Sequence, residues 1–276
     1  MQSGTDVPAG SRPPLLHGVF KGNTRQFCEI PVEFLPSLTF YDTLSYPLFS
    51  WQTLLLSSTM HRILITSGPT REYLDPVRYL TNGSSGRMGT ALAEAILQQG
   101  DMPVIVSGPV AVSYPSEAEV HWVETTEQML QCCLELFPHC AGVIGAAAPC
   151  DFRPVSFSEQ KISKPKAGGG ITVQFAETPD ILAALQRIKR LDQWSIAFAL
   201  ETTDGKHRAL EKLKQKCCDF VVLNEPGAIN RDEASFHVFD AVGELRSHFI
   251  GSKRVFAEEL LRLVFAPGTA NQCRYL

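Results

Sequence analysis

The chain has 276 residues, of which 44% are hydrophobic and 20% charged, and its net charge at pH 7 is −4. This size and composition predict that the bulk of the chain folds, as one large α/β domain or two small ones. The weakly negative charge argues against a nucleic-acid-binding surface.

Residues 1–59 differ from the rest of the chain. They are rich in Pro, Ser and Thr and show no sustained helical or alternating period, which predicts a leader that is disordered or loosely packed. The alternative is a helical extension that packs on a partner subunit. Because the first clean strand follows Met60, we expect the folded domain to span residues 60–276, and Met60 is a candidate natural start.

From residue 62 onward, predicted strands and helices alternate. This alternation predicts a Rossmann-like α/β fold, with a mostly parallel sheet and helices on both faces. The predicted strands are 62–66, 103–107, 121–123, 142–147, 195–200 and 220–223, and the predicted helices are 86–98, 127–136, 179–190, 206–216 and 255–264.

Turn residues refine this prediction at three places. Gly100 suits the C-terminus of the first helix, and Pro179 suits the first position of the third. The segments 235–241 and 244–250 alternate around a Val-Gly pair and predict a terminal antiparallel hairpin at one edge of the sheet.

The eight cysteines contain no Cys-x-x-Cys pair, and no Cys/His cluster has the spacing of zinc ligands. Two pairs of adjacent cysteines lie in helix-like contexts, which is typical of packed, reduced thiols, so we expect a reducing, cytoplasmic location. Prolines and an aspartate interrupt the apolar stretch 34–56, so it is a poor membrane span, and no targeting segment is recognised.

The segment between the first strand and the first helix carries the densest chemistry. Residues 67–89 read SGPTREYLDPVRYLTNGSSGRMG. A glycine-rich loop before a helix gathers free backbone N–H groups and so predicts an anion site, with substrate phosphate contacts at Gly83, Ser84, Ser85 and Gly86. The plain alternative is a long connection whose Ser and Gly residues cap the helix.

This loop fits a dinucleotide fingerprint poorly. About fifteen residues separate the strand from the Asn-Gly pair, and the second strand ends in Ser-Gly-Pro without an acidic residue for a ribose. A Tyr-x-x-x-Lys pair is also absent. An NAD(P)-dependent Rossmann oxidoreductase therefore stays an alternative, which tight NADPH binding without CTP binding would favour.

A second set of motifs follows the fourth strand. Residues 145–154 read GAAAPCDFRP, and residues 161–164 read KISK. A strand end of very small residues lets a flat ligand approach the backbone, and Asp151 is a candidate ligand for a metal–phosphate unit. Lys161 offers a point charge to a phosphate or an oxyanion, whereas the plain alternative is a solvated lysine loop.

Three further segments lie at places where α/β proteins bind ligands. Thr-Pro-Asp-Ile at 178–181 begins a helix, Phe-Ala-Leu-Glu-Thr at 198–202 ends a buried strand, and Asn224 ends another. Lys212 and Lys216 are one helical turn apart. The alternatives are a plain helix start and a solvated lysine face.

Together these motifs resemble the phosphopantothenate–cysteine ligase family, the ligase domain of the DNA/pantothenate metabolism flavoproteins, over about residues 62–265. The resemblance implies condensation of 4'-phosphopantothenate with L-cysteine in coenzyme A biosynthesis. CTP first activates the substrate carboxylate and releases pyrophosphate, which leaves an acyl-cytidylate. The amine of cysteine then attacks, and CMP leaves.

The resemblance also implies residue roles. Asn82 binds the acyl-cytidylate and positions its carbonyl, Arg78 assists the cysteine-dependent step, and Lys161 contacts the nucleotide and stabilises charge during activation. The other implied nucleotide contacts are Ala146, Ala147, Asp151, Thr178, Pro179, Asp180, Ile181, Phe198, Lys212 and Lys216.

The family further implies Mg²⁺ as cofactor, CTP as co-substrate and a homodimer in which one subunit completes the other's site. No flavin-dependent decarboxylase motif is found, so we expect no FMN and a separate decarboxylase that consumes the product. The chain departs from the family at Pro149, Cys150, Thr178 and Leu200, which leaves the choice of CTP or ATP open. A non-catalytic nucleotide-binding module is the remaining alternative.

Overall fold

The structure is a computed structural model that describes residues 60–164, 170–200, 204–224 and 233–265. The predicted leader, residues 1–59, and the Glu-Thr pair that follows Leu200 lie outside the described residues. Among those described, no helix is both long enough and apolar enough to cross a bilayer.

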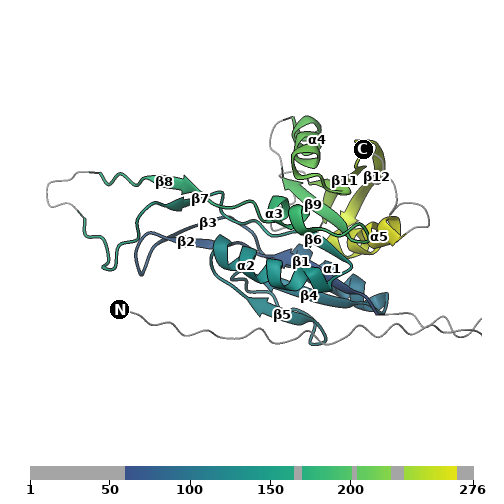
Figure 1. Ribbon diagram of the computed structural model, residues 1–276, viewed down its shortest axis with the longest axis horizontal. Helices are drawn as coiled ribbons and strands as arrows, with labels where there is room; N and C mark the ends of the chain where they lie inside the picture. Colours follow the sequence, from purple (N-terminus) through teal and green to yellow (C-terminus); the bar gives the residue numbers. More distant parts are fainter. Residues whose placement is uncertain (1–59, 165–169, 201–203, 225–232, 266–276) are drawn as a thin grey trace, which may run out of the picture. The chain divides into compact units, whose positions relative to one another are not determined.

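A single eight-stranded sheet organises these residues, in the order β12-β11-β10-β9-β6-β1-β4-β5 (Figure 1). In this sheet the neighbouring strands β10, β9, β6, β1, β4 and β5 pair in parallel, whereas β11 and β12 are antiparallel at one edge. This arrangement confirms the predicted fold class. The strands are β1 (Arg62–Ser67), β4 (Met102–Ser107), β5 (Glu119–Trp122), β6 (Gly142–Gly145), β9 (Trp194–Leu200), β10 (Phe220–Asn224), β11 (Glu233–Asp240) and β12 (Leu245–Ser252).

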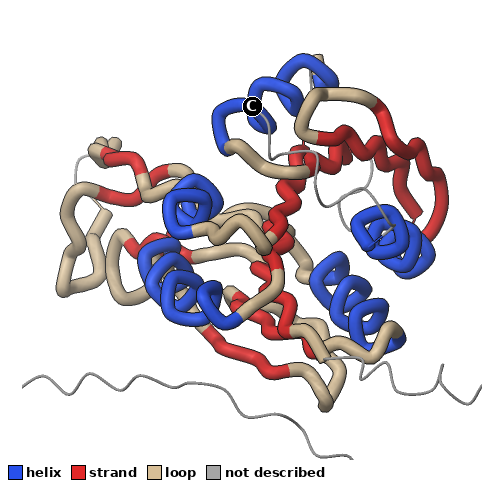
Figure 2. The backbone as a smooth tube through the Cα atoms, turned by 45° about the vertical axis from the view of Figure 1, so that its right-hand side comes forward, coloured by secondary structure: helices blue, strands red, loops and turns tan. Residues whose placement is uncertain are grey.

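Five helices cover both faces of the sheet, as the tube view in Figure 2 shows. α1 and α5 pack on one face, and α2, α3 and α4 pack on the other. The helices are α1 (Arg87–Gln98), α2 (Thr126–Leu136), α3 (Ile181–Ile188), α4 (Gly205–Lys216) and α5 (Lys253–Phe265).

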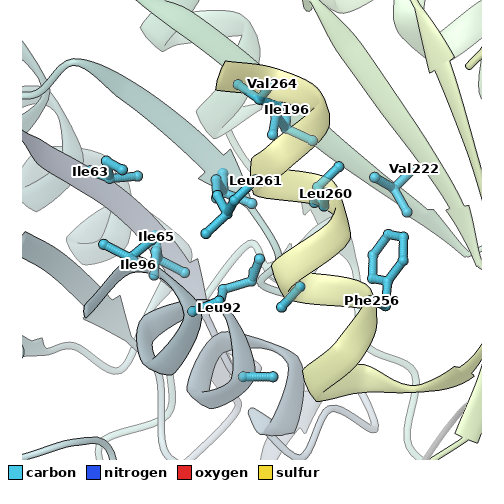
Figure 3. Close-up of a cluster of buried hydrophobic side chains, with 14 of the residues drawn as sticks. Ile63, Ile65, Leu92, Ile96, Ile196, Val222, Phe256, Leu260, Leu261 and Val264 are labelled. Atoms are coloured by element: carbon cyan, nitrogen blue, oxygen red, sulfur yellow. The ribbon is translucent and has the colours of Figure 1, made fainter. Parts of the chain in front are cut away.

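The central strand β1 shows why both faces are apolar. Successive strand side chains point to opposite faces, so Ile63 and Ile65 join the cluster under α1 and α5, while Leu64 joins the cluster under α2 to α4. Figure 3 shows Leu92 of α1 and Leu261 of α5 beside these isoleucines. All five side chains are fully buried, which is the burial pattern of a parallel strand covered on two sides.

Several predicted boundaries hold, and others differ from the structure by two residues. Gly100 follows the end of α1 with φ 84°, and the terminal hairpin turns at Gly243 with φ 85°, as expected. By contrast, β5 begins two residues before the predicted strand, and β6 ends at Gly145 rather than two residues later. Pro179 lies outside α3, because Asp180 is its N-cap and accepts a hydrogen bond from the Ala183 amide at 3.0 Å.

Two short hairpins were not predicted. β2 (Arg71–Tyr73) pairs with β3 (Tyr79–Thr81), and β7 (Phe152–Pro154) pairs with β8 (Phe175–Glu177). Both extend from the long loops that follow β1 and β6, beyond the carboxyl ends of the sheet strands (Figure 1). Each strand has only three residues, so no alternating pattern is long enough to reveal it.

Candidate active site

A cavity of about 760 Å³ opens at the carboxyl ends of the parallel strands. It lies where the strand order reverses, because β1 is followed by β4 on one side and β6 pairs with β1 on the other. This switch point is where open α/β sheets bind ligands, and the volume suits a small-molecule ligand.

Most of the predicted site residues line this cavity, although they come from five separate parts of the chain. The predicted residues at the cavity are Asn82, Gly83, Ser84, Ser85, Gly86, Ala146, Ala147, Asp151, Thr178, Pro179, Asp180, Ile181, Phe198, Lys212 and Lys216. Arg78 and Lys161 are not among the lining residues.

The N-terminus of α1 forms one wall of the cavity. Gly86 is the N-cap, with φ 77° and no side-chain cap, and the first turn of α1 carries no acidic residue. The positive end of the helix dipole therefore lies at the cavity without an acidic residue in the first turn of the helix. Arg87 lines the cavity at the same place. This wall has the features of a phosphate-binding site.

Very small residues form the part of the cavity that follows β6. A Cβ atom on Gly145 would lie 2.5 Å from a methyl group of Leu182, so glycine lets α3 approach the strand closely. The amides of Ala146 and Ala147 bond to Thr66 at the end of β1. The Asn82 Nδ2 donates to the Pro149 carbonyl at 2.9 Å, which joins the loops after β3 and β6.

A network of buried hydroxyl groups supports the small-residue loop that follows β6. The Thr70 hydroxyl accepts from the Cys150 amide and contacts the Thr126 hydroxyl, both at 2.8 Å. The Thr178 hydroxyl donates to the Cys150 carbonyl. Burial raises the pKa of the Cys150 thiol, which contacts the carbonyl of Leu80 at 3.5 Å. Cys150 and Thr178, at which the chain departs from the family, therefore belong to the hydrogen-bond network that supports the loop.

Two lysines of α4 also line the cavity. The Lys212 ammonium donates to the Phe198 carbonyl at 2.8 Å, and the Lys216 ammonium lies 3.1 Å from an Asp180 carboxylate oxygen. The plain alternative of a solvated lysine face is therefore wrong, because both side chains reach the cavity. Two positive charges therefore lie at the cavity.

Asn224, which the sequence analysis placed at a strand end where ligands bind, also lines the cavity. The Asn224 side-chain oxygen is buried and makes no hydrogen bond among the described residues, so it is an acceptor for a ligand N–H or O–H group. Its position at the end of β10 is the sequence feature that pointed to a ligand contact. Met88, which belongs to the motif before the first helix, also lines the cavity. Lys253 lines it too, and no sequence pattern indicated that residue.

Asp151 and Glu177 are carboxylates at the cavity, and Asp151 is the one expected from the sequence as a metal ligand. Its side chain is exposed at the cavity, whereas Asp180 is occupied by the Ala183 amide and by Lys216. Within the described residues, no three His, Cys, Asp or Glu side chains form a metal-binding group. A single carboxylate fits Mg²⁺, which commonly binds through one or two carboxylates together with substrate phosphates and water.

Arg78 and Lys161 lie together outside the lining. The Arg78 Nη1 donates to Asp75 at 2.8 Å and to the Ile162 carbonyl at 3.0 Å, and Lys161 is the exposed neighbour of Ile162. Segments that are far apart in the sequence therefore meet at this point.

Comparison with known proteins gives a consistent result. The family model described as DNA/pantothenate metabolism flavoprotein C-terminal domain matches residues 58–266. The coenzyme A biosynthesis bifunctional protein CoaBC of Vibrio vulnificus (strain CMCP6) is 34% identical over 206 residues, which are 73% of this chain and 51% of that protein. The protein of the same description from Bacillus subtilis (strain 168) is 37% identical over 209 residues, 74% of this chain and 51% of that one.

The chain thus spans about half the length of the curated relatives it matches. Among solved structures, the crystal structure of the C-terminal domain of CoaBC has 32% sequence identity and a TM-score of 0.63. The match covers 74% of this chain and 93% of that structure. The shared region is therefore the α/β domain that holds the cavity.

Proposed function

The chain belongs to the DNA/pantothenate metabolism flavoprotein C-terminal domain family, and on that basis we propose that it is a phosphopantothenate–cysteine ligase of coenzyme A biosynthesis. The observation that carries the proposal is the convergence of fifteen predicted site residues, which are scattered from Asn82 to Lys216 in sequence, on one cavity. The relatives named coenzyme A biosynthesis bifunctional proteins support the same activity.

The proposed reaction has two steps. In the first, an oxygen of the 4'-phosphopantothenate carboxylate attacks the α-phosphorus of CTP, and pyrophosphate leaves. In the second, the cysteine amine attacks the resulting acyl carbonyl, loses a proton and forms the amide, while CMP leaves. The cavity suits this sequence because both steps need charged and reacting groups held in one orientation away from bulk water.

Two separate parts of the cavity lining would hold the two phosphorylated substrates. The N-terminus of α1, with Ser84 and Ser85, suits the phosphate of phosphopantothenate. Lys212 and Lys216 suit the nucleotide phosphates, and to take that role Lys216 exchanges its Asp180 partner for a phosphate oxygen. Mg²⁺ bound near Asp151 would neutralise phosphate charge.

Asn82 lies between the α1 wall and the small-residue loop. Its Nδ2 already donates to carbonyl oxygens of that loop, so the same amide can donate to an acyl oxygen that replaces them. A donor aimed at an oxygen that gains negative charge stabilises the tetrahedral transition state of the second step. This is the role we propose for Asn82.

Arg78 and Lys161 enter the proposal through a second copy of the chain. Both lie outside the lining of their own cavity, so in a homodimer they would complete the site of the partner. The product would pass to a separate decarboxylase, and the ligase itself would use no FMN and act in the cytoplasm.

The test measures pyrophosphate release with phosphopantothenate, Mg²⁺ and either CTP or ATP, with and without cysteine. We expect release with CTP that depends on phosphopantothenate, and amide product only with cysteine. Asn82→Ala should lower product formation about 100-fold, since one transition-state donor is lost. Gln131→Ala removes an amide on the exposed face of α2 and is the matched control.

The competing functions give different results. Ordered CTP binding without pyrophosphate release would favour a non-catalytic nucleotide-binding module. NADPH binding without CTP binding would favour an oxidoreductase. ATP-dependent release would keep the ligase and change its nucleotide.

A further inference from the structure

Asp75 is a buried carboxylate at the centre of the Arg78 loop. Its side chain is fully buried, yet it accepts four hydrogen bonds from two separate segments. Oδ1 accepts from the amides of Val77 and Arg78, both at 2.8 Å. Oδ2 accepts from the Arg78 guanidinium at 2.8 Å and from the Ile162 amide at 3.2 Å.

The local half of this arrangement is an ordinary turn. An aspartate that accepts hydrogen bonds from the backbone amides two and three residues onward closes a tight turn, which is a common use of aspartate in proteins. The other half is not explained by the turn. The contact with Ile162 spans 87 residues of sequence and fixes the segment that carries Lys161.

Two more contacts make the connection rigid. The Arg78 guanidinium bridges Asp75 and the Ile162 carbonyl, so one side chain binds both segments. The Ser158 amide donates to the Leu74 carbonyl at 2.9 Å, which is a second attachment of the same two segments. Arg78 and Lys161 are therefore held in a fixed relation to each other.

The charge of Asp75 is required for this arrangement. Burial alone would raise the pKa of its carboxyl, but the amides of Val77, Ile162 and Arg78 and the Arg78 charge outweigh burial, so the pKa is lowered. All four donors point at an ionised acceptor. An asparagine side chain at this position would place its own N–H groups against one or more of these donors.

We propose that Asp75 is a positioning residue that locks Arg78 and the Lys161 segment into one unit, so that both steps of the ligase reaction depend on it. The inference rests on the proposed function. In that function Lys161 serves activation and Arg78 serves cysteine transfer, so losing either residue slows its own step. Asp75 contacts both segments, and its loss slows both.

The experiment compares Asp75→Asn with Arg78→Lys in two single-turnover assays. The first measures pyrophosphate release without cysteine, and the second measures amide formation when cysteine is added after the acyl-cytidylate has accumulated, so that the two steps are timed separately. We expect Asp75→Asn to lower both rates about 100-fold, the scale expected when catalytic groups are displaced by about 1 Å. Arg78→Lys should lower only amide formation. The double variant should lose less than the product of the two single losses, because the residues are in contact.

Asp240→Asn is the matched control. Asp240 is also a buried aspartate that accepts from two backbone amides, of Val242 and Glu244, and from an arginine, Arg246. It lies opposite the first residue of β10, at the other end of that strand from the cavity. We expect it to lower the stability of the protein but leave both rates at the wild-type level.

A second readout does not depend on activity. Hydrogen exchange of the Ile162 amide should become at least about tenfold faster in Asp75→Asn, because a hydrogen bond to a charged acceptor is lost. Exchange in β1 should be unchanged. If the wild-type protein makes no amide, the proposed function fails while faster Ile162 exchange still supports the lock. Unchanged exchange, or loss of only one catalytic step, would overturn it.

Discussion

The Cys150 thiol is buried against backbone carbonyl groups, although the residue lies within a predicted site motif. It follows Pro149 and precedes Asp151, and it is one of the departures from the family that leave the choice of CTP or ATP open. In the structure its sulfur lies 3.6 Å from the Thr70 carbonyl oxygen, and the residue is only 2% exposed. A loop has no side-chain period, so the sequence cannot indicate which residues face a ligand and which face the interior.

We expect the cysteines to react in an order set by burial. Among the cysteines that the structure describes, exposed Cys217 should be alkylated first by iodoacetamide at pH 8, while Cys133, Cys150 and Cys218 stay protected. The thiolate is the reactive form, and burial raises the pKa of all three protected thiols, that of Cys218 to about 11. Peptide mass spectrometry measures each site, and labelling in denaturant is the control. Rapid alkylation of Cys150 in the folded protein would contradict its position.

Asn82, Ala146 and Phe198 were matched to the site by the order of motifs, and the structure brings them to one cavity. Arg78 and Lys161 were matched by the same reasoning, but they lie elsewhere on this chain. A sequence motif identifies residues that belong to a site, but it does not indicate which cavity each residue lines. That information depends on contacts between distant segments.

Helix α1 is the element that most directly shapes the site. It packs on β1 through Gly89, where a Cβ atom would lie 2.0 Å from the Ser67 hydroxyl oxygen. That hydroxyl is held by Tyr114 at 2.8 Å, so it is not free to move aside. The strand, glycine-rich loop and helix were predictable because each is a local pattern. The hairpins β2–β3 and β7–β8 were not, because longer-range packing decides such short strands.

Gly89→Ala should destabilise the protein by about 1–3 kcal/mol, the usual cost of overpacking. Helix propensity alone predicts the opposite sign, a gain of about 1 kcal/mol. Urea unfolding measures the difference. The control is Gly83→Ala, where a Cβ atom meets nothing within 4 Å and the change should stay within about 0.5 kcal/mol. A Gly89→Ala protein more stable than wild type would show that α1 can shift away from β1.

The distribution of helices over the sheet follows from the order of the strands. Crossovers between parallel strands are right-handed, so connections that run in opposite directions from the centre place their helices on opposite faces. α1 connects β1 to β4, whereas α3 and α4 connect β6, β9 and β10 in the other direction. The alternation of elements predicted two covered faces. It did not predict which helix covers which face, because strand order is not written in local patterns.

The two faces should unfold together. Leu261 of α5 and Leu185 of α3 are fully buried in the clusters on opposite sides of the sheet. We expect each substitution to alanine to cost about 2–5 kcal/mol, and the double variant to lose the sum. Urea unfolding followed by circular dichroism and by tryptophan fluorescence should give one coincident transition. Two separated transitions would indicate that the faces fold as independent units.

The small-residue loop after β6 has a consequence for inhibitor resistance. An inhibitor that lies against Ala146 and Ala147 touches mainly backbone, which no point mutation can remove. A larger side chain there would expel the inhibitor, but it would fill the same space that the natural ligands need. Escape variants selected against such a compound should therefore arise at the outer residues of the cavity, such as Leu200, rather than in this loop.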